Sequence, residues 1–191
     1  MFLILMSLLL FVHGAHADLV AWYPLDDAPG TGGFFDASGN DYHGGTKNAT
    51  YTGESLFLGS GSFAWTAQNI PATTDKNFTL ALWVKPDSTD ENGWGDLVRK
   101  APEENAWIDG AKRLRLEPDN VRFIWSSANL AADDSHSLWD DQWHHVAVTY
   151  DTTDHNVRLY VDGVQKGVKT ADLTVNPDDL SWEYFIGGSN F

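Results

Sequence analysis

The sequence predicts an all-β fold, a sandwich of two antiparallel sheets. Short runs of β-branched and aromatic residues recur along the 191 residues, and Gly, Pro, Asn and Asp separate them. No window of ten or more residues carries apolar positions at helical spacing without a Gly or Pro interruption. Many short strands with frequent turns are typical of two-sheet sandwiches.

The clearest strands lie between Trp143 and Gly163. Two runs of strand-forming residues flank a polar break at 152–154, and the second run ends in Asp162-Gly163. This dipeptide tolerates positive φ at both central positions of a tight hairpin turn. We expect residues 164–170 to return as a third antiparallel strand.

Further strands are expected on both sides of this meander. Residues 78–84 alternate, with Phe78, Leu80, Leu82 and Val84 on one face, and Pro86 ends the run. The other expected strands are 19–25, 96–100, 113–117, 121–125 and 184–186. Residues 94–111 and 126–141 are expected to form long loops, where binding residues usually lie on a rigid sandwich.

Residues 1–17 are expected to be a cleaved export signal. Residues 2–12 are almost entirely apolar, and Ala15-His16-Ala17 has the small-x-small pattern of a signal peptidase site. The run is too short for a membrane-spanning helix, and no later segment is long and apolar enough to be one. We therefore expect residues 18–191 to form one domain that is secreted, periplasmic or on the cell surface.

The formal net charge is −15, and residues 1–17 contribute no Asp, Glu, Lys or Arg to it. Such a surface repels nucleic acid and anionic membranes. It favours solubility, and it is also compatible with calcium binding, because Asp and Asn oxygens are natural calcium ligands. The chain has no Cys, so an exported domain of this size depends on packing, a metal or oligomerisation rather than disulfides.

The order of several motifs resembles the LamG-like jelly-roll family, within the concanavalin A-like lectin/glucanase superfamily. The matching phrases span almost all of residues 18–191. They are residues 19–26 (LVAWYPLD), 36–40 (DASGN), 43–44 (HG), 78–86 (FTLALWVKP), 143–151 (WHHVAVTYD), 159–163 (LYVDG) and 186–188 (IGG).

The resemblance implies a jelly-roll sandwich that serves as a binding module. Family members usually continue with a strand pair that contains a phrase like Phe-x-Gly-x-Ile-Asp-Glu-Val-Arg-Ile-Tyr, which is not found before Phe191. We therefore expect a C-terminally incomplete domain of a longer, multidomain protein. Expected partners are a polysaccharide, a glycoprotein or another extracellular protein; the alternative is a structural or adhesion module.

The turn at residues 36–41 is the candidate metal site, with Asp36 and Asn40 as expected calcium ligands. Oxygen-bearing side chains at alternate positions on a Gly-containing turn can converge on a hard cation. The resemblance implies that such domains often hold one calcium near this turn. The alternative is an Asx-type turn, in which Asp36 accepts hydrogen bonds from nearby backbone N–H groups and Asn40 adopts αL geometry.

Aromatic and basic side chains provide the candidate ligand site. Of the nine Trp residues, those in strand phrases are expected to pack in the core or between strands (Trp22, Trp83 and Trp143), and those in or near loops are expected to be freer (Trp94, Trp107, Trp139 and Trp182). Exposed Trp faces can stack on sugar rings, so Trp94, Trp107 and Trp139 are candidate ligand-binding residues. The alternative is that they pack loops onto the sandwich.

Arg113 and Arg115 share one face of an expected strand, and Arg122 lies on its expected partner. Neighbouring guanidinium groups can bind a carboxylate or sulfate of an acidic glycan. The alternative is a solvated sheet face whose charge Glu117 balances.

We expect no catalytic activity. Retaining glycosidases need two carboxyl groups about 5–5.5 Å apart, and the glucanase-like phrase Glu-x-Asp-x-x-Glu does not occur. The adjacent pairs 103–104 and 140–141 are acidic, but neighbouring side chains usually diverge. His144 and His145 are sequential on an expected strand, so they point to opposite faces and cannot share a metal.

Overall fold

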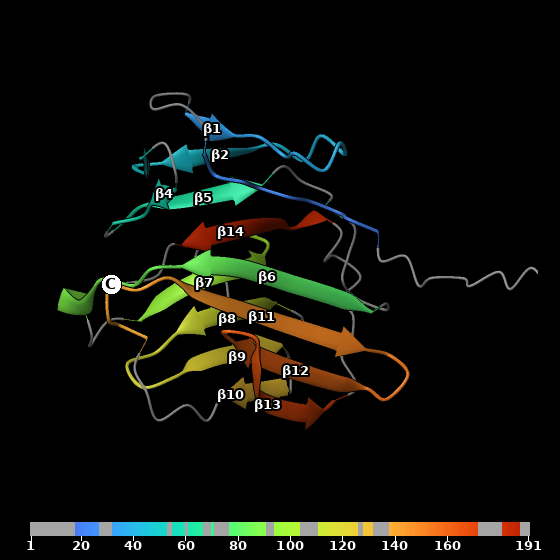
Figure 1. Cartoon of the computed structure of the whole chain (residues 1–191). Coiled ribbons are helices and arrows are strands. Elements are labelled where there is room, and N and C mark those ends of the chain that lie inside the picture. Colours follow the sequence, from blue (N-terminus) through green and yellow to red (C-terminus); the bar gives the residue numbers. More distant parts are fainter. Residues whose placement is uncertain are drawn as a thin grey trace, which may run out of the picture.

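The computed structural model describes residues 18–26, 32–52, 55–59, 61–66, 70, 77–90, 94–103, 111–125, 128–131, 138–171 and 181–187. Within these ranges, every regular element except one short 3-10 turn is a β-strand, and every strand pair is antiparallel. The strands form two facing sheets (Figure 1). The predicted all-β antiparallel sandwich is confirmed.

One sheet has four strands in the order β13-β12-β11-β6. Its strands are β6 (Phe78–Val84), β11 (His144–Asp151), β12 (Asn156–Val161) and β13 (Val164–Thr170). β12 and β13 meet at the predicted hairpin, where Asp162 has φ 50° and Gly163 has φ 77°. Both central positions of the turn therefore lie in the region that this dipeptide tolerates.

The second sheet has eight strands in the order β1-β2-β5-β14-β7-β8-β9-β10. Its strands are β1 (Gly33–Phe34), β2 (Gly44–Lys47), β5 (Phe63–Thr66), β7 (Gly95–Ala101), β8 (Lys112–Leu116), β9 (Val121–Trp125), β10 (Ala128–Ala131) and β14 (Glu183–Gly187). β3 (Thr50–Tyr51) and β4 (Leu56–Phe57) form a separate small pair, and η1 (Ser88–Asp90) follows β6. In the described ranges no helix has the length and apolarity needed to span a bilayer.

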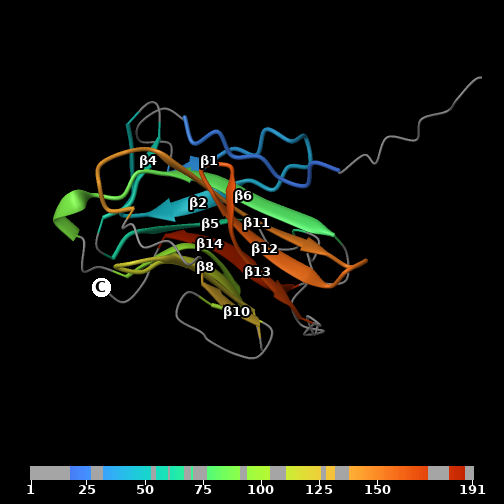
Figure 2. The ribbon, with the colours of Figure 1, turned by 60° about the horizontal axis from the view of Figure 1, so that its bottom comes forward.

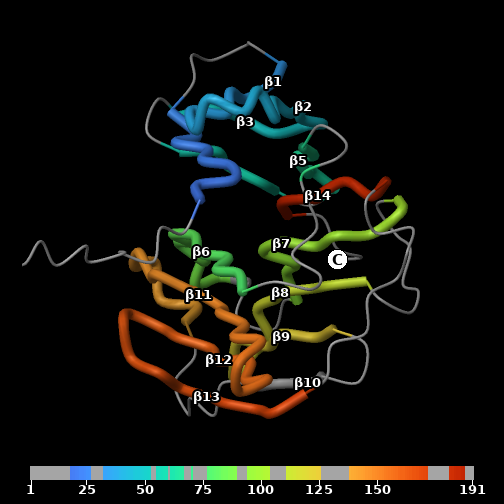
Figure 3. The backbone as a smooth tube through the Cα atoms, turned by 90° about the vertical axis from the view of Figure 1, so that its right-hand side faces the viewer, coloured from blue at the N-terminus to red at the C-terminus, as the bar shows by residue number. Residues whose placement is uncertain are grey.

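The main hydrophobic core lies between the four-stranded sheet and β7–β9. Alternate residues of each strand point into it, as the two-residue side-chain period of a strand requires. The two layers face each other around this core (Figures 2 and 3). The buried residues are Leu97, Leu114, Leu116, Val121, Phe123, Trp125, Leu138, Val146, Val148, Tyr150, Val157, Leu159 and Val161.

A second, smaller core lies near β1, β2 and β5. It consists of buried Phe34, Tyr51 and Ala64, with four partly buried residues packed against it (Tyr23, Leu25, Leu56 and Ile186). Gly44 is required here, because a Cβ at that position would collide with the ring of Phe34 and the carbonyl oxygen of Trp65. The two strands can therefore approach only with a glycine between them.

The strand predicted for residues 19–25 is not formed. From Val20 to Asp26 the side chains alternate between exposed and half-buried, but the segment has no ladder of backbone hydrogen bonds. The N–H of Ala37 donates to the carbonyl oxygen of Trp22 on one side. A strand needs a paired edge, and β6, in the same layer, does not pair with this segment (Figure 3).

The two segments predicted as long loops also contain strands. β7 (Gly95–Ala101) confirms the strand predicted at residues 96–100, whereas β10 lies within residues 126–141, where no strand was predicted. β10 pairs with β9, the strand just before it in the chain, and β7 pairs with the next strand, β8, and with β14 from the C-terminal part of the chain. The pattern of residues within a strand does not indicate which other strand it pairs with.

Candidate functional site

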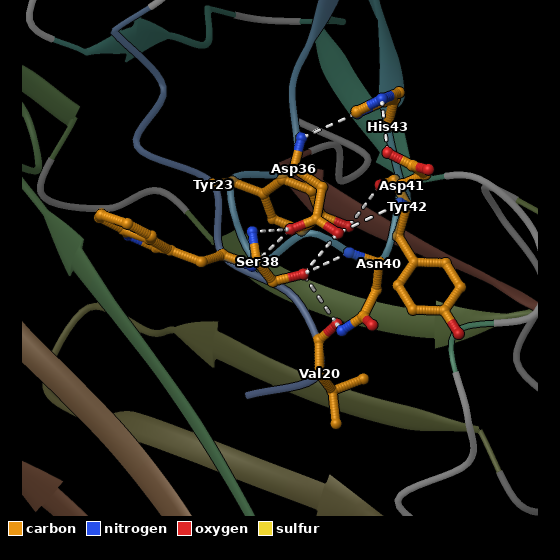
Figure 4. Close-up of polar contacts among 9 residues, drawn as sticks. Val20, Tyr23, Asp36, Ser38, Asn40, Asp41, Tyr42 and His43 are labelled. Carbon is orange, nitrogen blue, oxygen red and sulfur yellow. Dashed lines mark hydrogen bonds and ion pairs between the residues drawn. The ribbon is translucent and has the colours of Figure 1, made fainter. Parts of the chain in front are cut away.

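Asp36 ties the N-terminal segment to the turn that follows β1 (Figure 4). Its Oδ1 accepts hydrogen bonds from the backbone N–H groups of Trp22 and Ser38, each at 2.9 Å. Its Oδ2 accepts from the hydroxyl of Ser38 at 2.8 Å and from the N–H of Tyr42 at 3.1 Å. Burial by itself raises the pKa of Asp36, but these hydrogen bonds outweigh burial and hold the pKa below its usual value.

Asn40 anchors the same segment from the other side of the turn. Its Nδ2 donates to the carbonyl oxygens of Leu19 at 3.0 Å and Val20 at 2.9 Å. Positive φ values fall on Gly39 and Asp41 rather than on Asn40. The turn therefore matches the Asx-type alternative, except that αL geometry is adopted by the neighbours of Asn40.

This arrangement does not fit a calcium ion at Asp36 and Asn40. Four N–H and O–H donors surround the carboxylate of Asp36, whereas a hard cation needs oxygen lone pairs directed at it. The described ranges also contain no group of three or more His, Cys, Asp or Glu side chains that could hold a metal. Calcium binding stays a prediction, and the geometry of these two residues does not favour it.

The second candidate site lies on the face of β8 and β9 that points away from the main core. Leu114 and Leu116 of β8 point into the core, so Arg113 and Arg115 project to the opposite face. Arg115 pairs in register with Arg122 of β9, which projects to the same face. The predicted grouping of the three arginines on one face is therefore present.

Glu117 joins two of these arginines. Its Oε1 accepts hydrogen bonds from Nε of Arg115 at 3.0 Å and from Nε of Arg122 at 2.7 Å. The hydrogen bond to Glu117 raises the pKa of Arg122. The sequence suggested Glu117 as a counterion on a solvated face, but its side chain is only 5% exposed. Its buried carboxylate therefore holds the side chains of Arg115 and Arg122 in position.

Asp96 of β7 has the same role for the other arginines. Its Oδ2 lies 3.0 Å from Nη1 of Arg99, and its Oδ1 lies 3.2 Å from Nε of Arg113. Burial raises the pKa of Asp96, against the opposing attraction of Arg113, Arg99 and Arg115. The sequence did not single out Asp96 or Arg99, because only the register between β7 and β8 brings them to this face.

We call these six residues the arginine cluster: Asp96, Arg99, Arg113, Arg115, Glu117 and Arg122. They combine four guanidinium groups with two carboxylates, an excess of positive charge in a chain whose net charge is −15. The side chains of Arg113, Arg115 and Arg122 are 18–27% exposed, whereas those of Asp96 and Arg99 are at most 3% exposed. A ligand could therefore reach the first three.

Trp94 lies beside the arginine cluster and is exposed to solvent. The guanidinium carbon of Arg115 lies 4.2 Å from the centre of the Trp94 ring, and Trp94 is 47% exposed. Trp139 is partly buried against the main core, and its Nε1 donates to the backbone oxygen of Glu117 at 3.2 Å. The structure thus brings together three of the five predicted ligand-binding residues, Trp94, Arg113 and Arg115, whereas Trp139 packs against the main core. Trp107 lies outside the described residues.

The positions of several other tryptophans were predicted only in part. Trp22, Trp83 and Trp143 were expected to pack in the core or between strands. They are 54%, 64% and 50% exposed, so none is a core residue, but Trp83 does pack between strands, against its cross-strand partner His145. Trp83 is on the outward-facing positions of β6, where its ring lies 5.2 Å from that of His145. Trp182 was expected to be free in a loop, but it is buried with Ala101 and Ala111. An aromatic residue in a strand phrase does not reveal which sheet face is covered.

His144 and His145 point to opposite faces, as predicted. Nδ1 of His144 lies 2.9 Å from Oδ2 of Asp162, and its Nε2 lies 3.1 Å from Oδ1 of Asp140. Burial lowers the pKa of His144, but the hydrogen bonds to Asp162 and Asp140 outweigh it and raise the pKa. The sequence missed this triplet, because Asp162 reaches His144 only through the β11–β12 pairing.

Asp140 and Asp141 diverge as predicted for an adjacent acidic pair. Asp140 contacts His144, whereas both oxygens of Asp141 accept hydrogen bonds from Ser88. The two carboxylates therefore serve different structural contacts rather than facing a common substrate position.

Comparison with known proteins places the chain in a family. The family profile described as the concanavalin A-like lectin/glucanases superfamily matches residues 57–191, more than half of the chain. No curated protein sequence matches.

Solved structures with a similar fold include two botulinum neurotoxin binding domains. The type DC domain in complex with SialylT has a TM-score of 0.60 at 12% identity, and the serotype D domain has a TM-score of 0.57 at 17% identity. The match covers 85% and 81% of this chain, respectively, and 44% of each neurotoxin domain. The chain therefore spans less than half of the length of these two structures.

A third similar structure is domain 4 of AbnA, an extracellular GH43 arabinanase of Geobacillus stearothermophilus, in complex with arabinotriose. Its TM-score is 0.54 at 17% identity, and the match covers 79% of this chain and 76% of that domain. Identities this low support a shared fold and nothing finer. The profile match over residues 57–191 shows that the chain belongs to the concanavalin A-like lectin/glucanases superfamily.

Proposed function

We propose that this chain is an exported, non-catalytic carbohydrate-binding module. Its binding surface is Trp94 together with Arg113, Arg115 and Arg122, and its ligand is an oligosaccharide that carries carboxylate or sulfate groups. The observation that carries the proposal is the exposed Trp94 ring stacked on Arg115 beside two further arginines.

The chemistry of this surface suits an acidic sugar. A Trp face stacks on the apolar face of a sugar ring, and guanidinium groups bind carboxylate or sulfate through paired N–H donors. Asp96 and Glu117 hold the arginines in place before a ligand arrives, which lowers the entropic cost of binding. None of the four surface side chains offers an oxygen ligand, so binding here needs no calcium.

The similar structures support a binding role in general, without the identity of the ligand. Two of the similar structures are complexes, of the type DC neurotoxin domain with SialylT and of domain 4 of AbnA with arabinotriose. The adjacent acidic pair at residues 140–141 diverges, which supports binding rather than hydrolysis.

A glycan array tests the proposal. The wild-type domain is applied to uronate, sialylated, sulfated and neutral oligosaccharides, and the strongest ligand is measured by calorimetry. We expect acidic glycans to bind above their neutral counterparts. Trp94→Ala should weaken binding about tenfold, because a stacked aromatic contributes about 1–1.5 kcal/mol.

The matched control is Trp83→Ala, which removes another exposed Trp (64% exposed, against 47% for Trp94) from the other sheet. It should leave the affinity within about twofold. Equal losses for Trp94→Ala and Trp83→Ala, or equal binding of acidic and neutral glycans, would contradict the proposal.

Export is part of the same proposal and rests on the apolar run at residues 2–12 and on Ala15-His16-Ala17. Expression of the full chain in a secreting host should yield a mature N-terminus at Asp18, which N-terminal sequencing or intact mass measures. Retention of Met1 on the secreted protein would contradict it.

A further inference from the structure

The segment just before β11, residues 138–142, connects the two sheets, and we call it the strap. Leu138 is buried in the main core. The indole Nε1 of Trp139 donates to the backbone oxygen of Glu117 in the eight-stranded sheet at 3.2 Å. In the other direction, the carboxylate of Asp140 contacts β11 of the four-stranded sheet. The strap therefore links the arginine cluster to the opposite layer of the sandwich.

Asp141 fastens the strap to the end of β6. Its backbone N–H donates to the carbonyl oxygen of Pro86 at 3.2 Å, and its two carboxylate oxygens accept from the N–H and the hydroxyl of Ser88. The hydrogen bonds from Ser88 lower the pKa of Asp141, so its carboxylate stays ionised at neutral pH. This contact therefore does not change with pH in the neutral range.

The contact through Asp140 differs, because it depends on a histidine. His144 lies between two carboxylates, with Nδ1 2.9 Å from Oδ2 of Asp162 and Nε2 3.1 Å from Oδ1 of Asp140. An ionised carboxylate only accepts hydrogen bonds, and a neutral imidazole has one N–H and one lone pair. An imidazolium can therefore donate to both carboxylates, whereas a neutral ring can donate to only one of them.

The surrounding charges leave His144 as the group that titrates near neutral pH. The hydrogen bond from His144 lowers the pKa of Asp140. Burial raises the pKa of Asp162, but the hydrogen bonds from His144 and His145 outweigh it and lower the pKa. Within the described ranges, the charged and titratable groups that face His144 or these partners are Asp140, Asp141, Asp162, His145 and Lys85.

Of the two carboxylates, Asp162 is the more firmly held. It lies in the tight β12–β13 turn, where its Oδ1 accepts from the N–H of His145 and its own N–H donates to the carbonyl oxygen of His145. Oδ1 of Asp140 accepts its other hydrogen bond from the N–H of Gln142, within the strap itself. A neutral His144 should therefore keep its hydrogen bond to Asp162, and the strap should lose its bond to β11.

The other end of the strap supports the arginine cluster. Trp139 is adjacent to Asp140, and its indole N–H holds the backbone oxygen of Glu117. The buried carboxylate of Glu117 in turn lies 3.0 Å from Nε of Arg115 and 2.7 Å from Nε of Arg122. Release of the strap would therefore loosen the backbone at Glu117 and, with it, the positions of both guanidinium groups.

We propose that Trp139 is a positioning residue of the arginine cluster, and that the protonation state of His144 controls it through Asp140. With an imidazolium the strap is fastened at both ends, Glu117 holds its two arginines in place, and an acidic ligand binds more tightly. With a neutral imidazole the strap is released and the ligand binds more weakly. The effect on affinity rests on the proposed function, whereas the coupling within the protein needs no ligand.

The first test follows the ligand-free protein by NMR between about pH 5 and 9, a range that spans the titration of an imidazole. The indole N–H of Trp139 and the guanidinium Nε resonances of Arg115 and Arg122 should shift with the same midpoint as the imidazole of His144. His144→Gln should abolish these shifts. His145→Gln, the matched control on the opposite face, should preserve them. Resonances that do not follow the titration of His144 overturn the proposal.

The second test measures the affinity for a heparin hexasaccharide, whose sulfates and carboxylates stay ionised above about pH 6. The affinity of the wild type should fall between about pH 6 and 9, by at least about threefold more than that of His144→Gln. His145→Gln should keep the wild-type ratio. Equal ratios for the wild type and His144→Gln contradict control by His144.

Asp140→Asn separates the strap from direct attraction between an imidazolium and an anionic ligand. The amide Nδ2 of Asn can donate to the Nε2 lone pair of a neutral imidazole, so the strap should stay fastened at high pH. The affinity of this variant should then change with pH no more than that of His144→Gln. A pH dependence that persists at the wild-type size would assign the effect to direct attraction and overturn the proposal.

Trp139→Phe tests the other end of the strap, because it keeps an aromatic ring against the main core but removes the N–H that Glu117 accepts. It should reduce the pH dependence of the affinity to that of His144→Gln. An unchanged wild-type pH dependence would show that Trp139 does not position the cluster.

The two proposals can fail separately. If the hexasaccharide binds at neither pH, binding of this acidic glycan is contradicted, and the NMR titration still decides whether His144 and Trp139 are coupled. If the hexasaccharide binds but the resonances of Trp139 ignore the titration of His144, the binding surface is supported and the coupling is overturned.

Discussion

Asp36 has the most connected carboxylate of the turn after β1, and it shows how one residue can fix an unpaired segment. Its four hydrogen-bond donors come from Trp22, Ser38 and Tyr42, so it joins the N-terminal segment to the sheet. Removing a buried charged acceptor leaves these donors without a partner, which is more costly than the bonds are favourable.

Asp36→Asn should therefore lower the free energy of unfolding by about 2–3 kcal/mol, because hydrogen bonds to a charged group contribute about 1.5–3 kcal/mol each and an amide can replace only some of them. Urea denaturation with tryptophan fluorescence measures the change. Asp41→Asn is the matched control, since Asp41 is exposed on the same turn. If calcium at saturating concentration raises the stability of the wild type but not of Asp36→Asn, the residue is a ligand after all.

His144 should make stability depend on pH in the neutral range. Its folded pKa is raised by Asp162 and Asp140, so the stabilisation is fully present below the unfolded pKa of about 6.5. It is lost as pH rises through the higher folded pKa. Unfolding of wild type and His144→Gln between pH 5 and about 9 should therefore differ most at low pH. NMR titration of the imidazole checks the direction, and a folded pKa below 6.5 would refute it.

At the scale of an element, the β8–β9 hairpin is joined by Glu117 as much as by its backbone ladder. The carboxylate accepts from Arg115 on one strand and from Arg122 on the other, while the turn closes with the N–H of Glu117 donating to Asn120. Buried ion pairs of this kind are costly to break from one side, because the other charges remain.

Glu117→Gln should cost about 3 kcal/mol of stability, since two partly buried guanidinium groups lose their carboxylate. Thermal and urea unfolding measure the loss. Asp119→Asn, an exposed carboxylate in the same turn, should change stability by less than about 0.5 kcal/mol. Similar effects of the two substitutions would show that Glu117 stabilises the protein only through its negative charge and not through its contacts with Arg115 and Arg122.

At the scale of the whole molecule, the two hydrophobic cores differ greatly in size. The main core involves β6, β7, β8, β9, β11 and β12, whereas the smaller one holds three buried residues, Phe34, Tyr51 and Ala64. Local stability follows the density of buried apolar contacts.

Native-state amide exchange should therefore be slowest in β11 and β12 and at least about tenfold faster in β1 and β2. Mass spectrometry of deuterated peptides resolves these regions. Uniform protection across both sheets would mean that the two cores unfold as one unit, contrary to their separation in the structure.

Much of the fold could be predicted from local pattern. The strands around residues 78–84, 121–125 and 143–170 follow from period-two alternation, and the β12–β13 turn follows from the tolerance of Asp162-Gly163 for positive φ. These features depend on neighbouring residues only. The arginines at 113 and 115 could be placed on one face for the same reason.

Tertiary structure alone decided which faces and edges are covered. Trp83 has the same local pattern whether its face is buried or open, and residues 19–25 read as a strand although no neighbour pairs with them. The contacts of Arg113 with Asp96 and of His144 with Asp162 arise from pairing between segments distant in the sequence. Alternation along a strand determines that two faces differ, but burial and pairing depend on what the rest of the chain places against each face and edge.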